Sequence, residues 1–308
     1  MFNFTLIRAI LEYLKRLPRS VLFSLIAILL SFFLSVIRNR RAVQKAASLS
    51  LSDRWKLHAL PHDHNFTQLS LNAFYIKGQL RHGFIGRKMT VFRLSDDSLV
   101  LHSPMCLSEE VQAKLDNLGV VKYVIIPPMH TLDAALYKER YPGAAFVGTT
   151  FTENKLKQKI VFDLAISTKN FSLHPQVRGF APLLKKSGPF ELLWSFCDVD
   201  GTTTVTCADF VFNIPLEWAT GFGGFVLKKL GSVGFFGVTR IGRFFMGDRN
   251  LPEVVRFFEA LSEGELCSIV DNFVMGHGVV VVGREEVANK LTAEIDRLTG
   301  IARRKGYL

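Results

Sequence analysis

The sequence has few cysteines, and none of them is paired in the way that zinc ribbons or disulfide frameworks require. It contains no C-x-x-C motif and no ladder of regular cysteine spacings. An isolated cysteine in a globular protein most often behaves as a small buried hydrophobic residue. We therefore expect structural roles for the four thiols, which are those of Cys106, Cys197, Cys207 and Cys267.

Acidic residues are scarce in one part of the chain only. The 308 residues carry a formal net charge of +11. Residues 1–56 hold ten basic residues and two acidic ones, which leaves a net charge of only +3 for the remaining 252 residues. The basic segment flanks an apolar run, an arrangement that indicates a membrane rather than a nucleic acid. The charge distribution thus predicts no nucleic-acid partner.

The apolar run extends from Val21 to Ile37 and contains no charged residue. Thirteen of its seventeen residues are Leu, Ile, Val or Phe. At roughly −0.3 to −0.6 kcal/mol each, these residues favour bilayer insertion by about 4 to 8 kcal/mol. The run has the minimum length for a bilayer span, and Arg38 follows it with no nearby small-residue cleavage site. The pattern predicts an uncleaved, single-pass signal anchor; a cleaved targeting peptide and a buried helix are the alternatives.

The composition divides the chain into four segments. Residues 1–41 are expected to contain an amphipathic segment and the membrane anchor, and residues 42–57 a polar linker. Residues 58–298 are expected to form one folded domain, and residues 299–308 a basic tail. Basic residues lie on both sides of the apolar run, so the orientation and the compartment stay open.

The expected domain alternates hairpins with helices. Residues 87–104 and 191–213 each predict a β-hairpin, because hydrophobic residues alternate on both sides of a polar turn. Between them, residues 120–149 predict a strand, a helix and a second strand that pairs in parallel with the first. A helix at 250–263, a strand at 266–276 and a final helix at 285–300 follow. Two mixed sheets facing one another, with helices outside, accommodate this order, so the predicted fold class is an α/β four-layer αββα sandwich.

Four metal-competent side chains follow or end predicted strands. A zinc site needs three or four His, Cys or carboxylate ligands at about 2.0 to 2.3 Å, and sites assemble where strand ends converge. The alternative is that Asp133 caps a helix, His130 bonds to a loop carbonyl, and the other two are ordinary polar residues. The candidate ligands are His130, Asp133, Asp209 and His277.

Several motifs together resemble the metallo-β-lactamase fold, and more closely an uncharacterised branch of it known as a domain of unknown function. The resemblance covers roughly residues 58–298. The motifs are RKMTVFRL with LVLHSP, then HTLDAALYKERYPGA, DGTTTVTCADFVFN, and GDRN ahead of GHG.

The resemblance implies a metal site with missing ligands. Metal-binding members carry His-x-His-x-Asp-His, a further His, a bridging Asp and a final His. His130, Asp209 and His277 match the first, bridging and last of these. The other positions hold residues that do not match, namely Leu132, Ala134, Ala135 and, near the further His, Asp198 and Asp200. The implied cofactor is therefore none or a single zinc, iron or manganese ion, with Asp133 as a fourth ligand.

A glycine- and phenylalanine-rich segment occupies residues 219–247. Its glycines and four basic residues argue against a second membrane span. It is expected either to cover one end of the sheets or to present an apolar surface to the bilayer, a lipid-like ligand or a protein. Two functions follow: a membrane-anchored, ligand- or partner-binding domain without catalysis, which is slightly favoured, or a single-metal hydrolase of an unidentified substrate that uses the four candidate ligands.

Overall fold

The computed structural model describes residues 48–80, 85–182 and 189–308. The chain divides into one unit that ends at Arg54 and a second unit, Trp55–Leu308, which contains both β-sheets. The predicted anchor, Val21 to Ile37, lies outside the described residues. In the described ranges, no helix combines the length and apolar character needed to cross a bilayer.

The first sheet has seven strands in sequential order. Its first four strands pair antiparallel and the rest in parallel. The hairpin of β3 and β4 and the parallel pairing of β5 with β6 confirm two of the predicted units. The strands are β1 (Thr67–Gln68), β2 (Ala73–Gln79), β3 (Gly86–Arg93), β4 (Ser98–His102), β5 (Val120–Ile125), β6 (Ala145–Thr149) and β7 (Leu164–Ile166).

The second sheet runs in the order β14-β13-β11-β10-β9-β8, with β12 paired to β11. The predicted hairpin of β10 and β11 is present, and β11 pairs in parallel with β13. The hairpin of β8 and β9 was not expected from the sequence. The strands are β8 (Asn170–His174), β9 (Val177–Phe180), β10 (Leu193–Cys197), β11 (Thr203–Asn213), β12 (Phe236–Gly237), β13 (Asn272–Gly278) and β14 (Val281–Val282).

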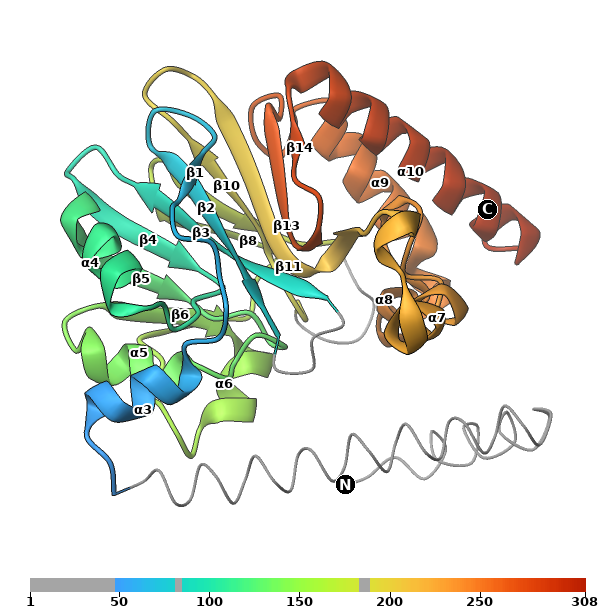
Figure 1. Cartoon of the computed structure of the whole chain (residues 1–308). Helices are drawn as coiled ribbons and strands as arrows, with labels where there is room; N and C mark the ends of the chain where they lie inside the picture. The colour runs from blue at the N-terminus through green and yellow to red at the C-terminus, as the bar shows by residue number, and fades with distance from the viewer. Residues whose placement is uncertain (1–47, 81–84, 183–188) are drawn as a thin grey trace. The chain divides into compact units, whose positions relative to one another are not determined.

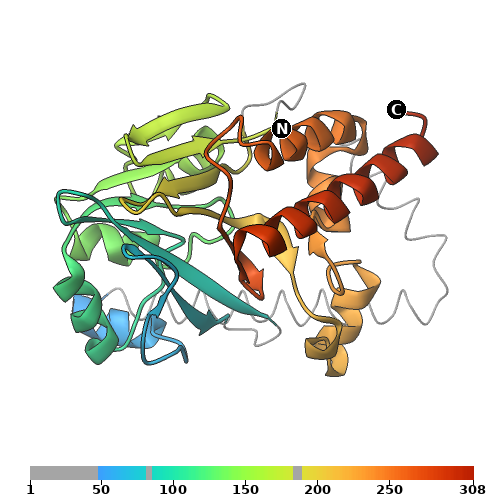
Figure 2. The ribbon, with the colours of Figure 1, turned by 90° about the horizontal axis from the view of Figure 1, so that it is seen from above.

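Helices cover the outer faces of both sheets. Figure 1 shows α4, α5 and α6 beside the first sheet, and α9 and α10 beside the second; the view from above in Figure 2 shows the same separation. The layers match the predicted αββα sandwich. The helices are α3 (Leu51–His58), α4 (Glu109–Leu118), α5 (Ala134–Arg140), α6 (Thr150–Leu156), α7 (Gly221–Lys229), α8 (Arg240–Met246), α9 (Leu251–Ser262) and α10 (Arg284–Arg304), with short 3₁₀ turns at Leu216–Trp218 and Asp248–Asn250.

Among the described residues, one hydrophobic core packs against each face of the second sheet. The first lies between the sheets, where Phe92 of β3 stacks on Phe196 of β10 with ring centroids 4.8 Å apart. The second lies between the second sheet and its helices, and it includes Phe273 of β13, Phe258 of α9 and Leu298 of α10. Side chains alternate between the two faces of a strand, so the second sheet contributes to both cores.

Three segments are more ordered than their sequence suggested. Helix α3 begins within the predicted linker 42–57 and ends one residue beyond it; Trp55 is buried, and its indole donates to the Leu107 carbonyl at 2.8 Å. Helix α10 continues to Arg304, inside the predicted tail 299–308, because Ala302 is buried in the second core. Residues 219–247 form α7, β12 and α8.

Candidate metal centre

His130 lies in the turn that joins β5 to α5. Pro127 and Pro128 lack backbone donors and so stop the strand from continuing, and helix α5 begins at Ala134. The His130 side chain is buried, and its Nδ1 hydrogen-bonds Ser103 Oγ at 2.5 Å. Ser103 has a φ of 57°, a left-handed conformation that is uncommon for a residue with a side chain. This strained residue after β4 fixes the orientation of the His130 ring.

Asp209 lies in a β-bulge of strand β11. The register with β13 runs to the pair Cys207 and Met275 and resumes at Phe212 and His277, so residues 208–211 face a single partner residue. The bulge frees backbone amides from the ladder. The buried Glu191 carboxylate accepts two of them, from Ala208 and, at 2.9 Å, from Asp209. The bulge thereby directs Asp209 towards the end of β13.

His277 lies near the carboxyl end of β13. Its Nδ1 donates to the Gly86 carbonyl of β3 at 2.7 Å, so in a neutral ring the lone pair lies on Nε2. The residue before it must be glycine: a Cβ on Gly276 would lie 2.6 Å from the Ala208 carbonyl oxygen and 2.9 Å from His130 Cε1. The absence of a side chain at Gly276 thus allows the backbone of β13 to lie directly against the His130 ring.

The structure brings three of the four predicted ligands together. The Nε2 atoms of His130 and His277 lie 3.2 Å apart. The Asp209 carboxylate lies 3.2 Å from His277 Nε2 and 3.5 Å from His130 Nε2. One ligand atom from each residue lies within 4.8 Å of the other two. We call His130, Asp209 and His277 the triad.

The triad has the donor set and the unsatisfied oxygen that a cation would use. Its two imidazoles and one carboxylate are ligands that Zn²⁺ prefers. Asp209 Oδ2 is buried without a hydrogen-bond partner in the described part of the chain. Buried polar atoms are nearly always paired, so this one calls for a missing ion or water. The residues present therefore fit a divalent metal ion.

Protonation in the triad also suits a cation. Burial lowers the pKa of His130 to about 4, which keeps the ring neutral at pH 7. Burial acts to raise the pKa of Asp209, but His130, His277 and Lys155 outweigh it and lower this pKa to about 2. Metal binding requires neutral histidine and ionised carboxylate.

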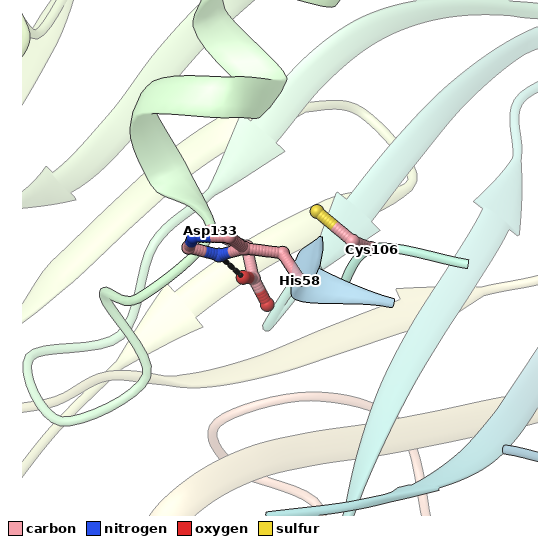
Figure 3. Close-up of side chains that lie close together, drawn as sticks. All are labelled: His58, Cys106 and Asp133. Atoms are coloured by element: carbon pink, nitrogen blue, oxygen red, sulfur yellow. Dashed lines mark hydrogen bonds and ion pairs between the residues drawn. The ribbon is translucent and has the colours of Figure 1, made fainter. Parts of the chain in front are cut away.

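Asp133, the fourth predicted ligand, is not in the triad. It occupies the N-cap position of α5 but makes no side-chain capping bond, so the alternative role as a helix cap is not observed either. Its carboxylate instead hydrogen-bonds His58 Nδ1 at 2.8 Å and pairs with the Arg87 guanidinium. Figure 3 shows Asp133 against His58, with Cys106 beside them. We call these three residues with Arg87 the Asp133 cluster.

In the Asp133 cluster, the Arg87 guanidinium supplies the positive charge that balances the Asp133 carboxylate. Asp133 is fully buried, and only 3% of the Arg87 side chain is exposed. Burial raises the pKa of the Cys106 thiol, so the sulfur keeps its proton and is a poor metal ligand. One ligand atom from each of His58, Cys106 and Asp133 lies within 4.8 Å of the other two. The Arg87 guanidinium already neutralises the carboxylate, so the charge of Asp133 is balanced within the protein.

Sequence reasoning missed the residues that support both groups. Ser103 and Glu191 hold the triad, while His58 and Arg87 hold Asp133. Arg87 and Glu191 begin predicted hydrophobic strands, and a charged residue at such a position is a usable signal of a buried partner. His58 carried no comparable signal, because its partner lies 75 positions away.

Comparisons with known proteins place the chain by fold. Neither a protein-family model nor a curated protein sequence matches it. Its sandwich is similar to rubredoxin oxygen:oxidoreductase from Desulfovibrio gigas, with 10% identity, a TM-score of 0.50, and coverage of 76% of this chain and 62% of that one. Two metallo-β-lactamases also match. DIM-1 has 11% identity and a TM-score of 0.48, with 76% and 96% covered, and the Pontibacter korlensis protein has 12% and 0.45, with 75% and 98% covered.

Identities this low speak to architecture and not to activity. The order of the two mixed sheets, the helices on their outer faces and the triad at the strand ends agree with the motif resemblance found in the sequence. The chain has the αββα sandwich fold that it shares with the oxidoreductase, which is the fold that the motif resemblance to the metallo-β-lactamases implies.

Proposed function

We propose that the chain is a single-metal hydrolase whose cation is held by the triad. One observation carries the proposal: the Nε2 atoms of His130 and His277 face each other at 3.2 Å, beside a buried Asp209 oxygen that has no hydrogen-bond partner among the described residues. Two nitrogen lone pairs at this distance would repel, so either a proton or a cation is expected between the two Nε2 atoms. Zinc suits this ligand set best, with iron and manganese as the other candidates.

The surrounding residues hold the ligands in place. Ser103 Oγ and the Gly86 carbonyl fix the two imidazole rings through their Nδ1 atoms. The Glu191 carboxylate holds the backbone of Asp209. Such outer contacts set the ring orientation and the donor strength of metal ligands. A bound divalent cation would supply a water of lowered pKa for attack on a carbonyl or phosphoryl group.

The structure supports one ion rather than two. The positions where the resemblance expects a second set of ligands hold Leu132, Ala134 and Ala135, none of which has a ligand atom. Leu132 is 46% exposed, and Ala134 is buried at the start of α5. A hydrolase of this chain would therefore rely on the triad alone.

Lys155 suggests the charge of the substrate. It lies in α6, its Nζ donates to the Pro128 carbonyl at 2.6 Å, and it is close enough to Asp209 for each charge to affect the other's pKa. An exposed cation beside a metal centre would favour a substrate with a negative charge near the bond that is cut. We propose an anionic ester or amide as the substrate class.

Metal analysis tests the proposed centre. Protein purified without chelator is expected to carry about one divalent ion per chain, because three preoriented ligands are available. His277→Ala should lose that ion, whereas the matched control His64→Ala, at an exposed histidine outside the triad, should keep it. Cobalt substitution gives a second readout, since its visible spectrum reports the ligand set independently of turnover.

Well-folded protein with far less than one ion per chain would favour the other function, in which the domain binds a ligand or partner without catalysis. The observation that supports this second function is the exposure of apolar side chains in or beside the glycine- and phenylalanine-rich segment. The exposed fractions are 55% for Leu216, 50% for Trp218 and 52% for Phe225. If these side chains form one contiguous apolar patch, that patch would mark a contact surface.

We also propose that the domain is anchored to a membrane through Val21 to Ile37. The support is the composition of that run and the basic residues on either side of it. The full chain should stay with the membrane fraction during alkaline carbonate extraction. A variant with Leu25→Lys and Leu29→Lys should be released, because a charged residue near the middle of a span costs about 2.5 to 3.5 kcal/mol.

A further inference from the structure

A basic pocket lies between α8, α10 and the turn that follows α7. Its volume is about 670 Å³. Phe235 and Ile301 form part of its wall, and a single acidic side chain, Asp248, lines it. The other charged lining residues are all basic: Arg240, Arg243, Arg297, Arg304 and Lys305. None of these residues belongs to the triad or to the Asp133 cluster.

The positive charge in the pocket is only partly balanced. Asp248 pairs with Lys305 and lies 3.5 Å from Arg243 Nη1. Arg297 is held by the buried Glu294, with contacts of 2.6 and 2.7 Å, and its guanidinium lies 4.3 Å from the Phe235 ring centroid. Counting Glu294 with Asp248, five basic groups face two acidic ones. The pocket keeps a net charge of +3.

Arg243 is the most constrained of these cations. Only 12% of its side chain is exposed, and its Nε is buried without a hydrogen-bond partner in the residues that the structure describes. Burial lowers the pKa of Arg243, as do the neighbouring charges of Arg297 and Arg240. A guanidinium held against like charges, with an unused donor, is in an environment that an anion would stabilise.

We propose that this pocket binds a phosphate group. A phosphate monoester carries about −1.5 to −2 charges at pH 7, which matches the unbalanced charge better than a carboxylate does. Arginine donors fit phosphate oxygens in pairs, and several of them converge here. The pocket is larger than a phosphate group, and Phe235 and Ile301 offer apolar contact to whatever the phosphate is attached to. That attached group is either a lipid or a small soluble molecule.

Calorimetric titration of the detergent-solubilised full chain tests the proposal with two probes, inorganic phosphate and dihexanoyl phosphatidic acid. Arg304→Gln should weaken binding by about tenfold, since it removes one charge-assisted hydrogen bond at the end of α10. Arg303→Gln is the matched control, because Arg303 is exposed on the same helix turn and does not line the pocket. It should change the affinity less than about twofold. Arg243→Lys, which keeps the charge but loses the paired donors, should also weaken binding.

The outcomes separate the sources of the phosphate. Tighter binding of the lipid probe, sensitive to Arg304→Gln but not to Arg303→Gln, supports a lipid headgroup; equal binding of both probes with the same sensitivity supports a soluble phosphate compound. Absence of binding by either probe at millimolar concentration overturns the proposal. Equal weakening by the two variants also overturns it, since that result indicates general charge attraction. Thermal unfolding without ligand should be unchanged in Arg304→Gln, which excludes misfolding as the cause.

Discussion

The triad and the Asp133 cluster contain similar ligand atoms at similar spacing, yet their chemistry differs. In both, one atom from each of three residues lies within 4.8 Å of the others. In the Asp133 cluster, the Arg87 guanidinium pairs with the carboxylate and the Cys106 thiol keeps its proton. In the triad, no lysine or arginine contacts the Asp209 carboxylate among the described residues, and one of its oxygens has no hydrogen-bond partner there.

The comparison shows that the spacing of ligand atoms does not identify a metal site. What separates the two groups is whether a protein cation already neutralises the carboxylate. A buried carboxylate needs a compensating charge, and it is supplied by Arg87 in one case. In the triad the nearest partners are two imidazoles, of which His130 is neutral at pH 7 because burial lowers its pKa to about 4. The Asp209 carboxylate thus has no lysine or arginine partner among the described residues, whereas the Asp133 carboxylate has Arg87.

Asp133→Ala and Asp209→Ala should separate the two groups most strongly. Removing Asp133 leaves Arg87 buried and unpaired, so the free energy of unfolding should fall by about 3 to 5 kcal/mol. Metal content should be unchanged. Asp209→Ala should instead lose the metal, with a smaller effect on the metal-free protein. Urea denaturation and elemental analysis of both variants measure the two quantities.

Loss of metal in Asp133→Ala would contradict the proposed difference between the triad and the Asp133 cluster. If Asp133→Ala lost the ion while remaining folded, the carboxylate would be a metal ligand after all, as the sequence suggested. His58→Ala is a control for the stability effect. It removes the hydrogen bond between His58 and Asp133 but leaves the ion pair between Arg87 and Asp133 in place. It should cost less stability than Asp133→Ala.

Ser103→Ala should weaken the triad without removing a ligand. The Ser103 hydroxyl fixes the His130 ring at 2.5 Å, and loss of such a partner lowers metal affinity by about 10- to 100-fold. Competition with a chromophoric chelator measures the affinity. Ser108→Ala is the control, since Ser108 is exposed at the start of α4 and its side chain makes no capping bond. Equal affinity in Ser103→Ala and wild type would show that the ring needs no external support.

The fold was more readable from the sequence than the site. Alternating hydrophobicity predicted the hairpin of β3 and β4. The order of strand, helix and strand from β5 to β6 predicted the parallel pairing of these two strands. These features are local, so a short window contains them. The motif resemblance predicted that His130, Asp209 and His277 lie close together, and the structure confirms this proximity.

The contacts that the sequence did not predict involve residues far apart in the chain. Asp133 was expected to be a ligand or a helix cap, but Arg87 and His58 bind it from 46 and 75 positions away. The bulge that directs Asp209 has no sequence signal such as glycine, and it depends on Glu191 accepting its free amides. Long-range partners of buried charges cannot be inferred from local periodicity, because the pairing depends on which strands become neighbours.

The smallest expected effect on stability concerns Lys88 of β3, which has different contacts from its neighbour Arg87. Arg87 pairs with Asp133, whereas the Lys88 ammonium donates to the carbonyls of Met275 and Gly278 on either side of His277. Successive side chains of a strand point to opposite faces, which explains the division. Lys88 therefore ties the first sheet to the strand that carries His277.

Lys88 should also give the folded protein a characteristic pH dependence. Burial, with a contribution from Lys77, lowers the pKa of Lys88 to about 7 from its ordinary value of 10.5. The unfolded chain then binds more protons than the folded chain between these values, so stability rises with pH through this window. From about pH 6.5 to 7.5 the gain is about 0.7 kcal/mol, measurable by urea denaturation. Lys88→Met should abolish this gain and Lys290→Met, at a partly exposed lysine on α10, should preserve it. A gain that survived in Lys88→Met would mean that the ammonium stays charged between its two carbonyls, making Lys88 a fixed charge like Arg87.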